Sequence, residues 1–247
     1  MQTTIESISD LKKVAWVADE FLDGPPRALV IWLHGTGCPE LKRGPSLEEY
    51  LWTKAGALVI LPYYGPWCWM NREARGFVDE VISAAMRLYN LGPEVPLLSM
   101  GGSMGGCGAL LLVRYSRHRA AGCLALHPVC DTARHFERPE VIRTMLCAFR
   151  GYAEPLAEVL DEQSPLAQAE AMPDIPYCVI HGDSDAVVNK EVHSARFVAR
   201  LRENGRKVDY LEVPGYGHEA LANSRQVLDK TVEFVAGFTM ESRVPAL

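Results

Sequence analysis

Short apolar runs alternate with amphipathic segments along most of the chain. The runs are rich in aliphatic residues and are bounded by turn-forming residues, which is typical of buried strands. Strands that alternate with helices predict an α/β domain with a mainly parallel sheet. We expect strands at Val14–Ala18, Ala28–Leu33, Ala57–Pro62, Val95–Met100, Gly122–Leu126, Tyr177–His181 and Val208–Val213.

The connections between these runs predict further structure. The sequence Asp-Gly-Pro-Pro-Arg separates the first two runs and is a strong turn signal, so we expect an antiparallel hairpin at the sheet edge. Apolar stripes at helical spacing predict helices at Asn71–Leu91, Glu191–Glu203 and Ser224–Phe238.

One interval breaks the alternation. Residues 129–175 contain no strong strand pattern but two helical pieces, Glu140–Phe149 and Pro155–Glu162. A helical insertion over the strand ends of a sheet is a common way to form a pocket. We interpret 129–175 as a small cap within a single domain that spans 1–247.

Composition limits the class of protein. The 247 residues are 48% hydrophobic, which suits one domain with a sizeable core. The net charge of −6 and the absence of a basic block argue against a nucleic-acid partner. No apolar run has the length of a membrane span, and the first residues do not resemble a signal peptide.

Cysteine usage indicates a reducing compartment. The seven cysteines are an odd number, and none of them forms a Cys-x-x-Cys pair. They are typical of free, mostly buried thiols in a cytoplasmic protein. Cysteines and histidines do not cluster at ligand spacing, so we expect neither a metal nor a cofactor.

The most informative stretch surrounds Ser103. Gly101-Gly102-Ser103-Met104-Gly105 is a G-x-S-x-G pattern between a predicted strand and an apolar, helix-like run. This context is typical of a nucleophilic serine at a sharp strand-to-helix turn. The alternatives are a plain glycine-rich turn and a phosphate-binding loop, although the stretch lacks the lysine of a P-loop.

A nucleophilic serine needs a base, and the base needs an orienting carboxylate. Asp183 and Asp185 follow one predicted strand, and His218 lies on a glycine-flanked loop after the next. The chain order serine, acid, histidine is that of α/β-hydrolases. Among the other histidines, we expect structural roles for His34 and His181. We expect surface positions for His118, His135 and His193.

Four motifs carry a resemblance to the α/β-hydrolase superfamily from about Ala28 to Phe238. They are His-Gly-Thr-Gly, Gly-Gly-Ser-Met-Gly-Gly, His-Gly-Asp-Ser-Asp-Ala-Val-Val and Gly-Tyr-Gly-His-Glu. The region before and within the third motif is similar to small esterases and to catalytic domains of the prolyl oligopeptidase group. The resemblance implies an α/β-hydrolase fold, a twisted and mainly parallel sheet flanked by helices, and favours Asp185 over Asp183 as the acid.

The resemblance also implies an oxyanion hole made by two backbone amides. One belongs to Thr36 and the other to Met104, directly after the serine. On the substrate side, an aromatic loop offers Tyr64 and Trp67, and His127 ends a strand beside the site. These three side chains either contact substrate or simply pack the structure together.

The sequence therefore favours a serine carboxylesterase with Ser103, Asp185 and His218 as its catalytic triad. We expect a small-molecule substrate with a short acyl group, such as an acetyl ester of a sugar or an aromatic acid. The alternatives are a prolyl oligopeptidase-like peptidase that acts on small peptides, and a hydrolase-fold protein that only binds a ligand. We expect a monomer or a homodimer.

Overall fold

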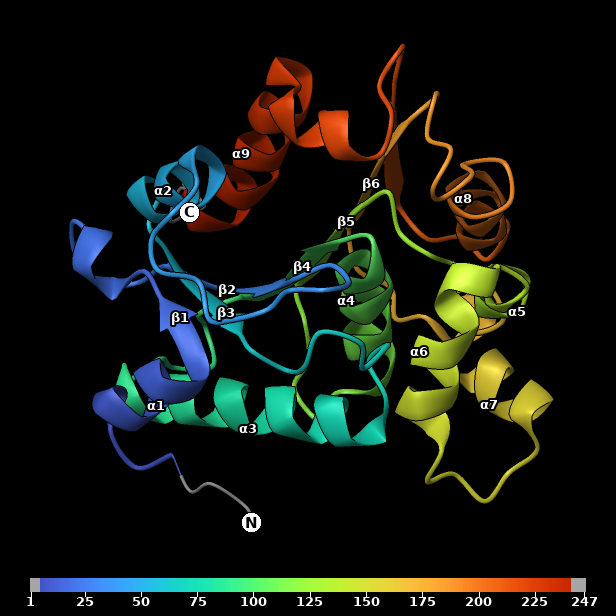
Figure 1. The fold of residues 1–247 in the computed structure, drawn as a ribbon. Helices are drawn as coiled ribbons and strands as arrows, with labels where there is room; N and C mark the ends of the chain where they lie inside the picture. The colour runs from blue at the N-terminus through green and yellow to red at the C-terminus, as the bar shows by residue number, and fades with distance from the viewer. Residues whose placement is uncertain (1–4, 241–247) are drawn as a thin grey trace.

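The computed structural model describes residues 5–240, which form one seven-stranded sheet with helices on both faces (Figure 1). The ends of the predicted domain, residues 1–4 and 241–247, lie outside this range. The strand order is β1-β3-β2-β4-β5-β6-β7. The strands are β1 (Ala15–Val17), β2 (Ala28–Leu33), β3 (Ala57–Pro62), β4 (Leu97–Gly102), β5 (Gly122–Leu126), β6 (Tyr177–Gly182) and β7 (Val208–Val213).

The predicted parallel sheet is confirmed, but the predicted hairpin is wrong. All pairings from β3 to β7 are parallel, whereas β1 runs antiparallel beside β3, with Ala15 opposite Pro62. Both edges of β2 are occupied, by β3 and β4, so β1 cannot pair with its sequence neighbour. The segment Asp-Gly-Pro-Pro-Arg does connect β1 and β2, but β3 lies between these two strands in the sheet, so the connection crosses β3 and does not form a tight hairpin.

Helices cover both faces of the sheet because successive strand residues point to opposite sides. Along β2, Leu29 and Ile31 join one core cluster, and Ala28 and Val30 join the other. The first cluster packs against α1, α3, α4 and α8, and the second against α2 and α9. Their bounds are α1 (Ile8–Val14), α2 (Leu47–Lys54), α3 (Arg72–Leu88), α4 (Met104–Tyr115), α8 (Ser194–Glu203) and α9 (Arg225–Thr239).

The segment between β5 and β6 is helical. It contains α5 (Thr132–Phe136), α6 (Pro139–Phe149), α7 (Leu156–Glu162) and the 3₁₀ turn η2 (Ala169–Ala171). The segment is fastened to the start of α3: Trp69 donates to the Thr144 hydroxyl at 2.9 Å, and Asn71 donates to the Ala148 carbonyl at 2.9 Å. Within residues 5–240, no helix is long and apolar enough to cross a membrane.

Two histidines that we expected at the surface are buried beneath this segment. His135 is 4% exposed and His193 is 3% exposed, and their rings lie 5.4 Å apart. Burial and the neighbouring His193 lower the pKa of His135 to about 3, while burial lowers the pKa of His193 to about 4. The expectation failed because His135 in α5 packs against His193 at the start of α8, and the His193 ring accepts hydrogen bonds from the Cys130 and Asp131 amides.

These histidines should make the fold sensitive to mild acid. Unfolding returns the pKa of His135 to about 6.5, so its contribution to stability is full above that pH and falls as the pH is lowered. Between pH 7 and pH 5 the loss should be about 2 kcal/mol for this residue. Urea unfolding of wild type and His135→Phe at both pH values measures it. An equal pH dependence in the two proteins would contradict the assignment.

Candidate active site

Ser103 lies at a sharp turn between β4 and α4. Its backbone angles are φ 58° and ψ −121°, a conformation that residues other than glycine rarely adopt. The Ser103 amide donates to the Leu126 carbonyl at 3.0 Å, and its own carbonyl accepts from the Cys107 amide at 3.0 Å. Such strain persists only where the surroundings impose it, and it is typical of functional sites.

The glycines around Ser103 are required by close packing. A Cβ atom on Gly105 would overlap the Leu33 carbonyl at the end of β2, and one on Gly101 would overlap the Gly105 carbonyl. On Gly106 it would lie 2.9 Å from the Leu126 carbonyl oxygen of β5. The start of α4 therefore approaches the neighbouring strand ends more closely than any side chain would allow.

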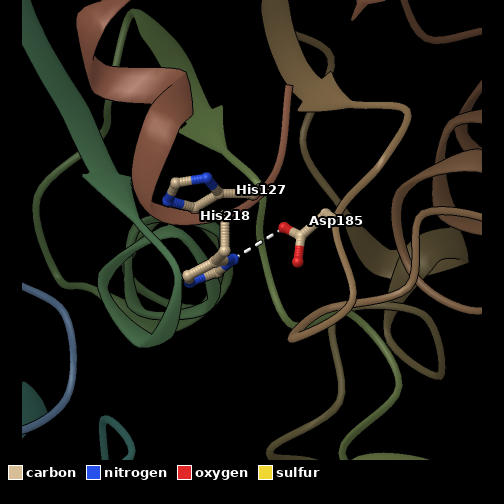
Figure 2. Close-up of side chains that lie close together, drawn as sticks. All are labelled: His127, Asp185 and His218. Carbon is tan, nitrogen blue, oxygen red and sulfur yellow. Dashed lines mark hydrogen bonds and ion pairs between the residues drawn. The ribbon is translucent and has the colours of Figure 1, made fainter. Parts of the chain in front are cut away.

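A chain of hydrogen bonds leads away from Ser103. The Ser103 hydroxyl lies 3.0 Å from His218 Nε2, and His218 Nδ1 lies 2.6 Å from Asp185 Oδ2 (the second bond is dashed in Figure 2). Because a carboxylate only accepts, Nδ1–H donates to Asp185, which leaves Nε2 to accept from the serine hydroxyl. The structure thus brings together the three residues that the sequence nominated from three separate segments.

The environment of Asp185 keeps it ionised. Burial alone would raise its pKa, but hydrogen bonds from His181, His218 and the Val188 amide outweigh this and hold the pKa well below its usual range. The Val188 amide donates to Asp185 Oδ1 at 2.8 Å, and the His181 Nε2 lies 3.3 Å from Oδ2. An ionised carboxylate at this place orients the His218 ring and can balance a positive charge on it.

Asp183, the other candidate acid, faces elsewhere. It accepts hydrogen bonds from the Gly215 amide at 2.7 Å and from the Ser184 hydroxyl at 2.9 Å. Asp183 is exposed and ties the loop after β6 to the loop after β7, while Asp185 is 6% exposed. The geometry therefore favours Asp185, in agreement with the motif.

A pocket of about 280 Å³ opens over Ser103. Its lining includes Thr36, His127, His218 and Glu219. Met104 buries its side chain at the first position of α4, where helix amides have no intrahelical acceptor. Thr36 lines the pocket and Met104 directly follows the serine, and their role as oxyanion donors stays a prediction.

The two aromatic candidates lie outside the pocket lining. Tyr64 is 7% exposed, donates to the His34 carbonyl at 2.7 Å and stacks on the His34 ring. Trp67 is 47% exposed, and its indole lies against Gly37. Both side chains support the loop that carries Thr36, which corresponds to the packing alternative.

The residues of the pocket lining that sequence reasoning missed include Trp32 and Glu219. Trp32 lies one residue before the end of β2, and Glu219 directly follows His218. The position of Glu219 beside the nominated base could have drawn attention to it. Residues 129–175 contribute nothing to the lining as described, so their role as a cap stays a prediction.

One group of side chains offers metal ligands. Ligand atoms of His127, Asp185 and His218 lie within 4.8 Å of one another. However, the two imidazole rings are stacked at 4.1 Å with 27° between their planes, so their in-plane lone pairs run side by side and do not converge (Figure 2). His218 and Asp185 are also joined by a hydrogen bond, and the arrangement fits proton transfer better than metal binding.

A comparison with models of protein families found a match. The model of the prolyl oligopeptidase family matches residues 80–241, which is more than half of the chain. The chain belongs to the prolyl oligopeptidase family. The matched range contains Ser103, Asp185 and His218. The resemblance noted from the motifs is confirmed, and a comparison with curated protein sequences found no match.

Solved structures confirm the α/β-hydrolase fold. A puromycin hydrolase aligns with a TM-score of 0.71 and 20% identity, over 88% of this chain and 34% of its own. An acylaminoacyl peptidase of Pyrococcus horikoshii aligns with a TM-score of 0.73 and 15% identity, over 91% of this chain and 38% of its own. An S-formylglutathione hydrolase of Agrobacterium tumefaciens aligns with a TM-score of 0.67 and 15% identity, over 87% of this chain and 85% of its own. The chain thus spans about a third of the length of the first two.

Substitution of Gly105 tests the packing that places Ser103. In Gly105→Ala the new methyl group must displace the Leu33 carbonyl or the start of α4, and with them the reacting groups. Because displacements of about 1 Å can lower rates about 100-fold, we expect a loss of that order in kcat/KM for a reactive ester. The control is Gly237→Ala in α9, where a Cβ meets nothing within 4 Å. Full activity in Gly105→Ala would show that this close packing does not position the serine.

Proposed function

We propose that the protein is a serine hydrolase that cleaves carboxylic esters through an acyl-enzyme intermediate. The observation that carries the proposal is the unbroken chain of hydrogen bonds from Asp185 through His218 to Ser103, at the floor of a pocket. A serine hydrogen-bonded to a histidine, which is in turn hydrogen-bonded to a carboxylate, is the arrangement that activates a serine for attack on a carbonyl carbon.

In the first step Ser103 Oγ forms a bond to the carbonyl carbon while its proton moves to His218 Nε2. The π electrons of the carbonyl move onto its oxygen, where the amides of Thr36 and Met104 donate to the negative charge. Each such donor is typically associated with about 3 kcal/mol of transition-state stabilisation. When the intermediate collapses, the ester C–O bond breaks and His218 returns the proton to the leaving alcohol.

In the second step water replaces the alcohol. His218 takes a proton from the water as its oxygen attacks the acyl carbon, and the proton then passes to Ser103 Oγ as the acid leaves. Asp185 keeps the Nδ1–H tautomer in place throughout and balances the charge of the imidazolium. No cofactor is needed for these proton and acyl transfers.

The pocket size favours a modest substrate. A volume of about 280 Å³ is at the lower end for small-molecule sites, which supports a short acyl group such as acetyl. The similarity in fold and length to an S-formylglutathione hydrolase supports an esterase-type reaction. A sugar or an aromatic group suits the alcohol part, because the Trp32 indole offers a flat surface in the lining.

A peptidase that acts on small peptides is the second candidate. Family membership and the likeness in fold to an acylaminoacyl peptidase favour it. The same triad would then return its proton to a leaving amine instead of an alcohol. A protein that only binds a ligand is a poorer proposal, because a binding role needs neither the strained serine nor its contact with His218.

Ser103→Ala tests the proposal. We expect wild type to hydrolyse p-nitrophenyl acetate and butyrate, and the variant to lose about 10⁴- to 10⁶-fold in kcat, because nothing else in the site can form the acyl bond. The matched control is Ser83→Ala, since the Ser83 hydroxyl also lies 3.0 Å from a histidine, His118, but outside the pocket. Hydrolysis of aminoacyl p-nitroanilides alone would replace the esterase proposal with the peptidase. No hydrolysis, with no labelling of Ser103 by a fluorophosphonate, would contradict both.

The charge in the pocket predicts a preference among esters. Glu219 has no ion pair within residues 5–240, and the lining described there contains no lysine or arginine. Burial lowers the pKa values of His34 and His127, so both are uncharged at neutral pH. We therefore expect esters with an ammonium group to react faster than neutral esters of the same size, and carboxylate-bearing esters to react more slowly.

Glu219→Gln should reduce this preference. Because the carboxylate is exposed, we expect a change of about two- to five-fold in the ratio of kcat/KM values, and a smaller one at high salt. The control is Glu170→Gln in η2, an exposed carboxylate outside the pocket lining. An unchanged ratio in Glu219→Gln would show that this charge does not select the substrate.

A further inference from the structure

His127 contacts His218 only through the face of its ring. The ring centroids are 4.1 Å apart and the planes meet at 27° (Figure 2). His218 already uses Nδ1 on Asp185 and Nε2 on Ser103, so neither of its nitrogens is left for His127. His127 therefore lies beside the chain of hydrogen bonds and is not a member of it.

The sheet holds His127 in a strained conformation. Its amide donates to the Ile180 carbonyl at 2.7 Å, and its φ angle is +33°, a value that residues other than glycine rarely adopt. The preceding residue, Leu126, accepts from the Ser103 amide, so the positions of His127 and the serine are linked through the backbone. Strain that the surroundings impose in this way is typical of functional sites.

The His127 ring is neutral. Burial, followed by the nearby His218 and His181, lowers the pKa of His127 to about 3. Its Nδ1 atom is buried and has no hydrogen-bond partner in the described part of the chain. A neutral aromatic ring has a negative face, which attracts a cation, whereas a protonated ring at this distance would repel one.

A positive charge forms on His218 in both steps of the proposed reaction, when Nε2 takes the proton of Ser103 or of water. We propose that His127 is a positioning residue whose neutral ring face keeps His218 aligned and stabilises its imidazolium form. This role rests on the proposed function, since it requires His218 to act as the base. The distance of 4.1 Å is well within the range of about 6 Å over which aromatic faces attract cations.

Two substitutions separate the ring face from the ring nitrogens. His127→Phe keeps an aromatic face and removes both nitrogens, whereas His127→Leu fills a similar space without an aromatic face. Both residues are comparably disfavoured at positive φ, so the backbone strain affects the two variants alike. His127→Met serves the same comparison if the leucine variant does not fold.

The measurement is kcat and KM for p-nitrophenyl acetate, with kcat expressed per Ser103 that a fluorophosphonate labels. We expect His127→Phe to keep kcat within about three-fold of wild type, and His127→Leu to lose about 3- to 30-fold, with little change in KM. His135→Phe and His135→Leu are the matched controls, because His135 is also buried with a lowered pKa but lies outside the pocket. We expect these two variants to have equal kcat values.

Other results would overturn the role. Equal kcat values for His127→Phe and His127→Leu would show that the aromatic face does not matter. Equal losses with a raised KM would instead indicate that a ring nitrogen binds the substrate. If Ser103 of the wild-type protein does not react with the fluorophosphonate, that result contradicts the proposed function itself. It does so independently of any difference between the two His127 variants.

Discussion

The contact between Gly105 and the Leu33 carbonyl determines where the reacting groups can lie. It joins the start of α4 to the end of β2, and it is possible only because Gly105 has no side chain. The same contact sets the distance between Ser103 and the loop after β2, which carries Thr36. Because β2 and β4 are adjacent parallel strands, Ser103 and the loop that carries Thr36 meet at the carboxyl ends of these strands.

The remaining groups follow from the order of the strands. β5, β6 and β7 continue the sheet beside β4, and the residues after them are His127, Asp185 and His218. Each of these follows the carboxyl end of its strand, so the sheet brings His218 within 3.0 Å of Ser103, which lies 115 positions earlier in the chain. The ionised Asp185 carboxylate accepts from His218, and the neutral His127 ring stacks on the same imidazole. This environment suits the positive charge that the proposed reaction would place on His218.

Much of this arrangement could be predicted from the sequence, because strand periodicity and strand-end motifs are local signals. Strands such as Gly122–Leu126 were predicted with the bounds that the structure shows. The hairpin was wrong because the free edge that β1 can use is decided by the whole sheet. The short helices α1 and α2 were missed, although Ser7 and Ser46 begin capping boxes that could have indicated them. The burial of Tyr64 and His135 depends on which segments cover them, and no local pattern reports that.

Reactivity and specificity have different origins in this molecule. The backbone of the sheet positions Ser103 and its partners; the range that the family model matches contains β4 to β7, whereas β2, which contacts Gly105, lies outside it. The walls of the pocket come from side chains at the ends of the same strands, such as Trp32, and from Glu219 in the turn after His218. The helical segment between β5 and β6 instead packs on α3 through Trp69 and Asn71. Substitutions at the strand ends can therefore alter the choice of substrate without moving the serine, whereas changes at the glycines of the turn alter the chemistry itself.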